Sequence, residues 1–222
     1  AALQGDEAAL LAWLDSGGRV NATCGVGDVS CVTALMYAAR CGHERMVELL
    51  LQRGAEIDLQ DSMGNTALLL AAADGKERVV DLLLQHGAEI NKQNSFGNTA
   101  LMSAAMTGHE RVVDLLMQHG AEINKQGNGG WNALMVAAAQ GQPAIVLRLL
   151  RAGADTALRS ENGKTALQWA KLKGHAECVR ILEEHAAAEA AAEAAAREAE
   201  RAAAEAEATR HAEALLAGEE AE

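Results

Sequence analysis

Aromatic residues, proline and cysteine are all scarce in this chain. Its 222 residues include one Phe, one Tyr, three Trp, one Pro and four Cys, although half of all residues are hydrophobic. A core must therefore be aliphatic, made of Leu, Val, Ala, Ile and Met. Four cysteines are too few for a disulfide-built scaffold, which predicts a reducing intracellular compartment, either the cytoplasm or an organelle.

The chain also lacks an excess of positive charge and any membrane signal. The formal net charge of −12 argues against general binding of nucleic acid or of an anionic membrane, both of which attract basic proteins. Residues 186–222 hold ten Glu and three Arg, a net −7, which leaves −5 for residues 1–185. No apolar run is long enough to cross a bilayer, and no basic segment precedes an apolar one as in a secretory signal. We therefore expect no direct membrane insertion.

Motifs for catalysis, cofactors and metals are also missing. The sequence contains no Gly-x-x-x-x-Gly-Lys-Ser/Thr loop, no Gly-x-Ser-x-Gly elbow and no dinucleotide fingerprint after a strand. Two His-Glu dipeptides, at residues 43–44 and 109–110, lack the second His that a zinc protease carries four residues after the first. The Cys-x6-Cys-x9-Cys-x-His spacing from Cys24 to His43 matches no standard zinc site. We expect no catalytic residue, no cofactor and no metal.

What the chain does contain is a 33-residue repeat. A Thr/Asn-Ala-Leu tripeptide returns at this interval, beginning at Thr33, Thr66, Thr99, Asn132 and Thr165. Two series of glycines keep the same interval: Gly42, Gly75, Gly108, Gly141 and Gly174, and Gly54, Gly87, Gly120 and Gly153. A fixed period of this length marks a solenoid, whose units bury their apolar faces against neighbouring units. Such a chain usually offers a long binding surface instead of a catalytic pocket.

One unit predicts two helices and a loop. Apolar residues recur at helical spacing over residues 67–72 and again over 79–84, and Gly75 and Gly87 follow these two stretches. Glycine adopts the left-handed conformation that closes a helix, so each glycine is a stop signal. The polar stretch 88–98 is rich in Asn, Gln and Gly and predicts a turn-rich finger.

This unit resembles the ankyrin repeat. The family pattern Gly-x-Thr-Pro-Leu-His-x-Ala-Ala-x-x-Gly-His, then Val-Val-x-x-Leu-Leu-x-x-Gly-Ala, is matched by GNTALMSAAMTGHERVVDLLMQHGAEIN at residues 97–124. The resemblance implies an all-α solenoid of helix-turn-helix units with finger-like hairpin loops. Ala replaces the family's Pro in all five full openings. The family's His, which ties neighbouring helices by hydrogen bonds, is replaced by Met36, Leu69, Met102, Met135 and Gln168.

The period also predicts the domain organisation. Ankyrin repeats are expected over residues 1–185, and an Ala/Glu/Arg-rich helical extension, continuous with the last repeat, over residues 186–222. The predicted repeats are 1–31 (partial, with an enlarged finger), 32–64, 65–97, 98–130, 131–163 and 164–185. Residues 1–5 align with 38–42, so we expect the chain to open near the end of a first helix. The stop glycine due at position 186 is Ala186, so the last helix should run from about residue 175 to a terminator at Gly218.

In the ankyrin family, partner proteins contact the finger tips and the exposed side of each first helix. Mapped by the period, the predicted partner contacts are Met63, Asn65, Asp74, Phe96, Asn98, Met106, Thr107, Trp131, Gln140, Lys164, Leu172 and Lys173. Large apolar groups such as Phe96 and Trp131 are typical interface anchors, and the alternative is that they fold back onto neighbouring fingers. Trp13 aligns with Leu50 and is predicted to lie in the core.

The resulting functional prediction is a protein-binding adaptor or scaffold that holds a partner of unknown identity in a concave groove. The alternative is an assembly subunit that docks into a larger complex through its long C-terminal helix. A heptad seam of small residues would admit another helix there: Ala188, Ala192, Ala195, Ala199, Ala202 and Ala206. The same tract also fits a solvated spacer.

Two finger asparagines, Asn91 and Asn124, carry a separate prediction. The resemblance implies that such residues can be substrates of an asparaginyl hydroxylase. The alternative is a structural role, in which the side chain holds the turn through backbone hydrogen bonds.

Overall fold

The computed structural model describes residues 6–26 and 29–219. The chain forms two compact units, Ala1–Leu182 and Glu183–Glu222. The predicted opening of the chain at residues 1–5 lies outside the described residues, as do residues 27–28 of the enlarged finger.

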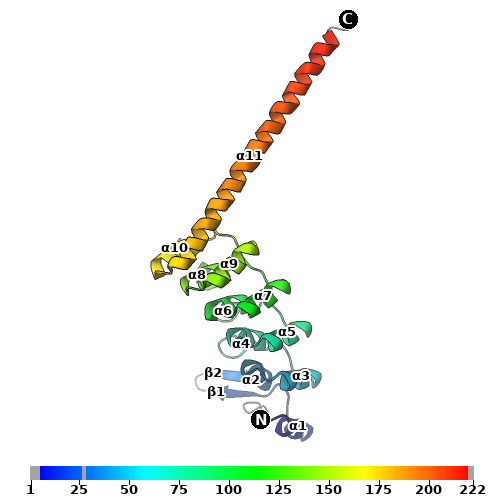
Figure 1. The fold of residues 1–222 in the computed structure, drawn as a ribbon. Helices are drawn as coiled ribbons and strands as arrows, with labels where there is room; N and C mark the ends of the chain where they lie inside the picture. The colour runs from blue at the N-terminus through cyan, green and yellow to red at the C-terminus, as the bar shows by residue number, and fades with distance from the viewer. Residues whose placement is uncertain (1–5, 27–28, 220–222) are drawn as a thin grey trace. The chain divides into compact units, whose positions relative to one another are not determined.

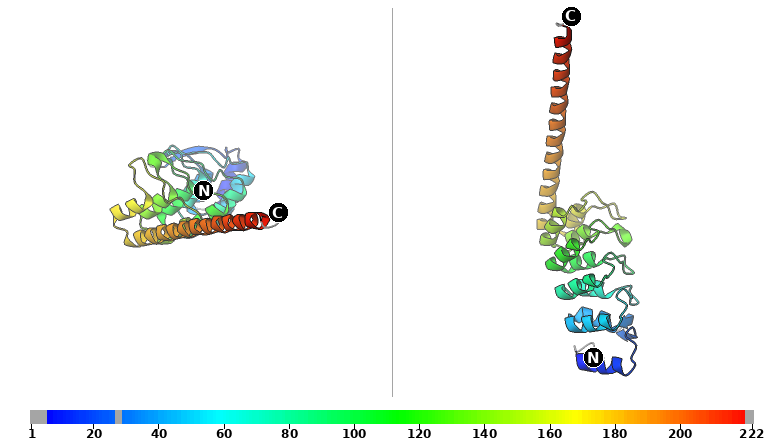
Figure 2. Two further views of the ribbon diagram at one scale, coloured as in Figure 1. Left: turned by 90° about the horizontal axis from the view of Figure 1, so that it is seen from above. Right: turned by 90° about the vertical axis from the view of Figure 1, so that its right-hand side faces the viewer.

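The first unit is a stack of helix pairs in sequence order (Figure 1). The inner helices are α2 (Ala34–Cys41), α4 (Ala67–Ala73), α6 (Ala100–Thr107), α8 (Ala133–Ala139) and α10 (Ala166–Lys173). The outer helices are α1 (Glu7–Asp15), α3 (Glu44–Gln52), α5 (Glu77–Gln85), α7 (Glu110–Gln118), α9 (Pro143–Arg151) and the start of α11 (Ala176–Glu219). Each inner helix packs against the next inner helix, and α3, α5, α7 and α9 pack in the same succession. Figure 2 shows the pairs following one another from α1 onward.

The fingers join the pairs. The first finger carries an antiparallel hairpin of β1 (Thr23–Val26) and β2 (Val29–Thr33), in which Thr23 pairs with Thr33. The finger before α8 contains a short 3-10 turn, η1 (Asn128–Gly130). These hairpin-like fingers and helix pairs confirm the predicted ankyrin-type solenoid.

Each inner helix begins at the repeated Thr or Asn. The side chains of Thr33, Thr66, Thr99, Asn132 and Thr165 accept a hydrogen bond from the backbone N–H three residues on, at 2.9–3.4 Å. Such N-caps satisfy a backbone donor that would otherwise lack a partner. The helices therefore have a start signal although Ala replaces the family's Pro.

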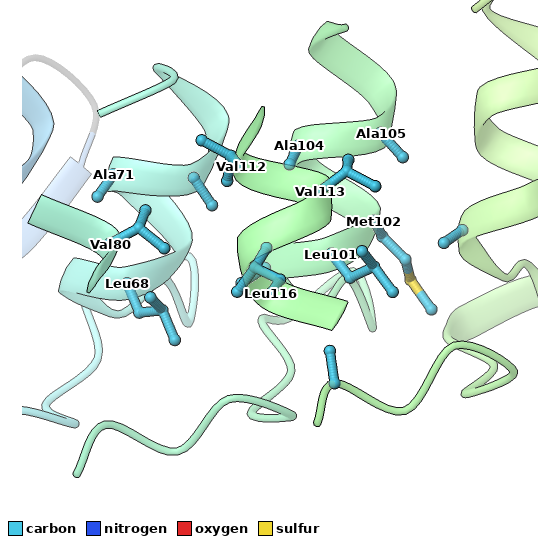
Figure 3. Close-up of a cluster of buried hydrophobic side chains, with 14 of the residues drawn as sticks. Leu68, Ala71, Val80, Leu101, Met102, Ala104, Ala105, Val112, Val113 and Leu116 are labelled. Carbon is cyan, nitrogen blue, oxygen red and sulfur yellow. The ribbon is translucent and has the colours of Figure 1, made fainter. Parts of the chain in front are cut away.

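The core between the two helix layers is aliphatic. Figure 3 shows Leu68 and Val80 of one pair beside Leu101, Val113 and Leu116 of the next, and all five side chains are buried. Small residues on the inner helices, such as the fully buried alanines of α4 and α6, let successive helices approach closely. Trp169 is the one aromatic residue among the buried hydrophobic residues of the described part.

Histidines in the turns tie successive pairs together. His109 Nε2 donates to the Ala73 carbonyl at 3.1 Å, and His175 Nε2 donates to the Ala139 carbonyl at 3.0 Å. These bonds connect neighbouring repeats even though the family's other His is replaced in this chain.

The prediction that Trp13 lies in the core was wrong. Its side chain is 40% exposed, whereas Leu50, with which it aligns, is fully buried. The indole instead covers the turn after α1, where ring atoms lie 2.5 Å from the place that a Cβ on Gly18 would take. Leu10 is the residue of α1 that is buried.

The second unit is the continuation of α11, which runs uninterrupted through Ala186, as predicted. The helix ends at Glu219, one residue beyond Gly218. All side chains from residue 186 to residue 210 are exposed. Ion pairs at i,i+4 link Glu193 to Arg197 at 3.5 Å and Arg201 to Glu205 at 3.3 Å. Within the described residues, we find no helix with the length and apolar character needed to cross a membrane.

Candidate protein-binding groove

A groove opens between the inner helices and the finger tips in the C-terminal half of the first unit. Its helix side is formed by Met106, Val136, Ala139, Gln140, Trp169 and Lys173. Its finger side is formed by Asn98, Asn128 and Trp131, and His175, which directly precedes α11, also lines it. The volume of this tryptophan groove is about 670 Å³, within the range of pockets that hold ligands. Five of the predicted partner contacts line it together.

Glutamine side chains hold the finger wall of the groove in register. Gln60, Gln93 and Gln126 each donate from Nε2 to two carbonyls at 2.6–3.1 Å, one four residues on and one 33 residues on. The first bond closes the glutamine's own finger and the second reaches the next finger. Backbone hydrogen bonds also join successive tips, from Ser62 to Ser30, from Ser95 to Met63 and from Glu161 to Gly129.

A second ladder involves Asn91 and Asn124, for which hydroxylation and a structural role are the two predicted alternatives. The side-chain oxygens of Asp58, Asn91 and Asn124 accept from the backbone N–H 31 residues on, with closest distances of 2.9–3.1 Å. Asn91 and Asn124 thus bind the backbone of the next repeat and not that of their own turn. The side chains therefore have a structural role that joins successive repeats instead of holding a turn, and hydroxylation stays a prediction.

Two tryptophans that line the groove contact each other. The rings of Trp131 and Trp169 lie with centroids 4.5 Å apart and planes inclined by 32°. The Trp169 N–H donates to Ser160 Oγ at 3.2 Å, which fixes that ring, and Lys164 Nζ lies 5.7 Å from its centroid. Trp131 therefore does fold back onto a neighbour and is half-buried, yet it still faces the groove.

Three predicted contacts are large apolar side chains left open to solvent. Phe96 is 55% exposed, Met106 is 41% exposed and Leu172 is 61% exposed. Phe96 lies on a finger tip, and the other two lie near the ends of α6 and α10. Folding does not account for their exposure.

Other predicted contacts make bonds within the first unit. Asp74 pairs with Arg40 at 3.2 Å, and Asn65 bonds through its side chain to both Asp61 and Asn94. Thr107 donates to the carbonyl of Ser103 at 3.0 Å. The half-buried Met63 lies beside Asn65 in the same finger. A pocket of about 100 Å³ there is lined by Asn65 and other residues of the N-terminal half.

Trp169, Val136 and His175 line the groove but were not among the partner contacts predicted from the sequence. Trp169 lies at the same inner-helix position as Tyr37 four repeats earlier, and this position favours a packing role for both residues. The structure shows that this position does both, since Trp169 is 9% exposed and still lines the groove. An aromatic residue recurring at one inner-helix position was the signal that could have identified it.

The perturbed titratable groups lie outside the groove. Burial, and secondarily the charge of Glu177, raises the pKa of the Cys178 thiol. Hydrogen bonds to Asp114 and Glu110 raise the pKa of the Arg148 guanidinium, which bridges α7 and α9. Throughout residues 6–26 and 29–219, no three His, Cys, Asp or Glu side chains converge as metal ligands would.

The stacked helix pairs, bonded fingers and open groove define a solenoid-type binding module. A family model described as ankyrin repeats (3 copies) matches residues 1–94, 75–160 and 134–222. The chain belongs to the ankyrin-repeat family, whose repeats are in general protein–protein interaction modules. A search of curated proteins finds no match.

Proposed function

We propose that this chain is an adaptor or scaffold that binds a partner protein in the tryptophan groove and on the neighbouring finger tips. The observation that carries the proposal is the exposure of Phe96, Met106 and Leu172, of which Met106 lines the groove together with the stacked tryptophans. Exposed apolar side chains next to a pocket are typical anchors of an interface.

Rigid presentation supplies the mechanism. Hydrogen bonds across the fingers, among them those of Gln93 and Gln126, fix the wall on which the anchors stand. Because the surface is ordered before the partner arrives, association loses less conformational entropy.

Binding, and not catalysis, fits the chemistry of the groove. The titratable side chains that line it are Lys173 and His175, and the Nε2 of His175 already donates to Ala139. A catalytic site needs converging groups that hold and release protons.

The test compares two sets of surface variants against a partner identified by proximity labelling of the intact chain. Replacing Phe96, Met106 and Leu172 together by Ala should weaken the measured affinity by about tenfold or more, because anchors carry most of the binding energy. The matched control is Leu147→Ala, which removes a 36%-exposed leucine from the outer helix α9.

The control should bind like the wild type, and both variants should keep their melting curves, since each of the four side chains is at least 36% exposed. Equal affinities for the groove variant and the wild type would refute the proposed site. Trp131 is left intact in this test because its contact with Trp169 contributes to packing.

A second candidate function, assembly into a larger complex through α11, is favoured by one observation. All side chains of α11 from residue 186 to residue 210 are exposed, so this part of the helix is available to another protein. Deleting residues 183–222 separates the candidates. Retained partner affinity supports the adaptor, and loss of incorporation into a complex supports the assembly subunit.

A further inference from the structure

We propose that the occupant of the tryptophan groove is an extended segment of a partner protein that carries one large apolar side chain next to a carboxylate. This inference rests on the proposed function and specifies the chemistry of the partner. Three features of the groove support this inference: its apolar surface, its unpaired positive charge and its unused hydrogen-bonding groups.

The apolar subsite lies between Met106 and the two stacked tryptophans. Because the Trp169 N–H is bound to Ser160, its ring cannot turn to offer a donor to the groove. Met106, exposed on the inner helix α6, also lines the groove. Thioether and indole surfaces together favour an aliphatic or aromatic side chain.

Positive charge gathers at the same groove. Lys173 lines it and makes no ion pair with any described residue, and Lys164 lies against the Trp169 ring. None of the residues lining the groove is Asp or Glu. In a chain of net charge −12, a groove with unpaired lysine and no carboxylate of its own is complementary to an acidic ligand.

The N-terminal half of the first unit provides the contrast. There the position of Lys173, three repeats earlier, holds Asp74, and Asp74 is already paired with Arg40. The small pocket nearby contains Asp61 as well as Arg40. Charge complementarity therefore places the carboxylate of the partner at the α10 end and not at the α2 end.

Several polar groups remain for the backbone of an extended segment. Among the described residues, the indole N–H of Trp131 and the side-chain amides of Asn98 and Gln140 form no hydrogen bond. An extended peptide presents backbone donors and acceptors that such groups satisfy. A groove of about 670 Å³ accommodates a few side chains of a strand but not a folded domain.

A single-stranded nucleic acid would also stack on tryptophan and contact lysine. The acidic net charge opposes it, because binding along a phosphate backbone depends on many basic contacts. A peptide is therefore the occupant that the observations favour, and nucleic acid becomes an outcome of the test.

The experiment selects binders to the intact chain from a displayed library of random 12-residue peptides. We expect enrichment of peptides with Asp or Glu within about three residues of Leu, Phe, Met or Trp. A selected peptide, made synthetically, should bind Lys173→Glu about tenfold more weakly or worse, since the variant sets two negative charges together. Arg151→Glu, on the outer helix α9, is the control with the same change in charge and should bind like the wild type.

Separate outcomes test the inference and the proposed function. Peptides that lose affinity on replacement of Met106 by Ala, but show no enrichment of acidic residues, would leave the groove as the binding site and overturn the acidic partner. Peptides indifferent to both Met106→Ala and Lys173→Glu, or no selected peptide at all, would overturn both. Tighter binding of a 12-nucleotide single-stranded oligonucleotide than of any selected peptide would overturn the peptide assignment.

Discussion

Single residues decide where this chain turns and how closely its repeats pack. Gly75 has a φ of 68°, in the left-handed region, and a Cβ there would lie 2.5 Å from Nδ1 of His109 in the next repeat. The His109 ring cannot easily withdraw, because its Nε2 is bound to Ala73. The glycine therefore meets two requirements, one from its own backbone and one from a neighbour.

Gly75→Ala should lower the free energy of unfolding by more than about 2 kcal/mol, the sum of left-handed backbone strain and a steric clash. Gly87→Ala isolates the first contribution, because Gly87 has a φ of 84° and nothing within 4 Å of its would-be Cβ. The free energy of unfolding of the Gly87→Ala control should fall by about 1 kcal/mol. Urea unfolding followed by circular dichroism measures both, and equal losses would mean that the clash with His109 is relieved without cost.

The sequence predicted the positions of site residues better than their environments. The 33-residue period assigned Phe96 and Trp131 to the finger region, but Phe96 is open to solvent and Trp131 stacks on a ring 38 residues later. Trp13 failed as a core prediction for the same reason. The period fixes the place of a residue within its repeat, whereas its burial depends on which side chains the neighbouring turn or repeat brings against it.

At the scale of elements, caps and inter-helix bridges hold the two helix layers. The N-cap threonines account for the start of the inner helices, and turn glycines such as Gly42 account for their ends. The outer helices are linked by ion pairs. Arg148 of α9 bonds to both Glu110 and Asp114 of α7, and its side chain is about one-third exposed.

Arg148→Met should lower the free energy of unfolding by about 1 kcal/mol at neutral pH and low salt, because it leaves two partly buried carboxylates without their shared cation. The raised pKa of Arg148 means that its contribution is fully present below the ordinary arginine pKa, so it holds across the neutral range and is lost only as pH rises through that raised pKa.

Arg111→Met is the control for this bridge, because Arg111 and Glu77 form a single pair at 3.6 Å with the arginine mostly exposed. The free energy of unfolding of Arg111→Met should fall by no more than about 0.5 kcal/mol. Chemical denaturation of both variants at low and high salt gives the comparison. Losses of the same size would show that the bridge from α9 to α7 contributes no more than a surface pair.

At the scale of the whole molecule, the stack is a one-dimensional array in which the main contacts between helices lie within a helix pair or join it to the next pair along the chain. Because the contacts are local, the sequence alone could predict both the stack of helix pairs and the long last helix. The period, the glycine stops and the missing stop at Ala186 are local signals repeated along the chain, and α11 runs on as they indicate. The groove could not be predicted in the same way, because Met106, Trp131 and Trp169 come from three successive repeats.

Deleting residues 183–222 should leave the unfolding free energy of the repeats within about 1 kcal/mol of the intact chain, because nearest-neighbour contacts set the stability of such arrays. The buried residues Cys178 and Leu182 of α11 are retained in this variant. The helical circular dichroism signal should fall in proportion to the number of helical residues removed. A stability loss of several kcal/mol would show that the extension supports the array.

The central claim is that the tryptophan groove is where a partner protein binds. Site-specific photo-crosslinking tests it most directly, with a photoreactive amino acid placed at Met106 in the groove or at Leu147 on the outer helix α9, in cells that contain the partner. We expect a covalent conjugate with a second protein from position 106 and none from position 147. Conjugates formed only from position 147, or equally from both positions, would contradict it.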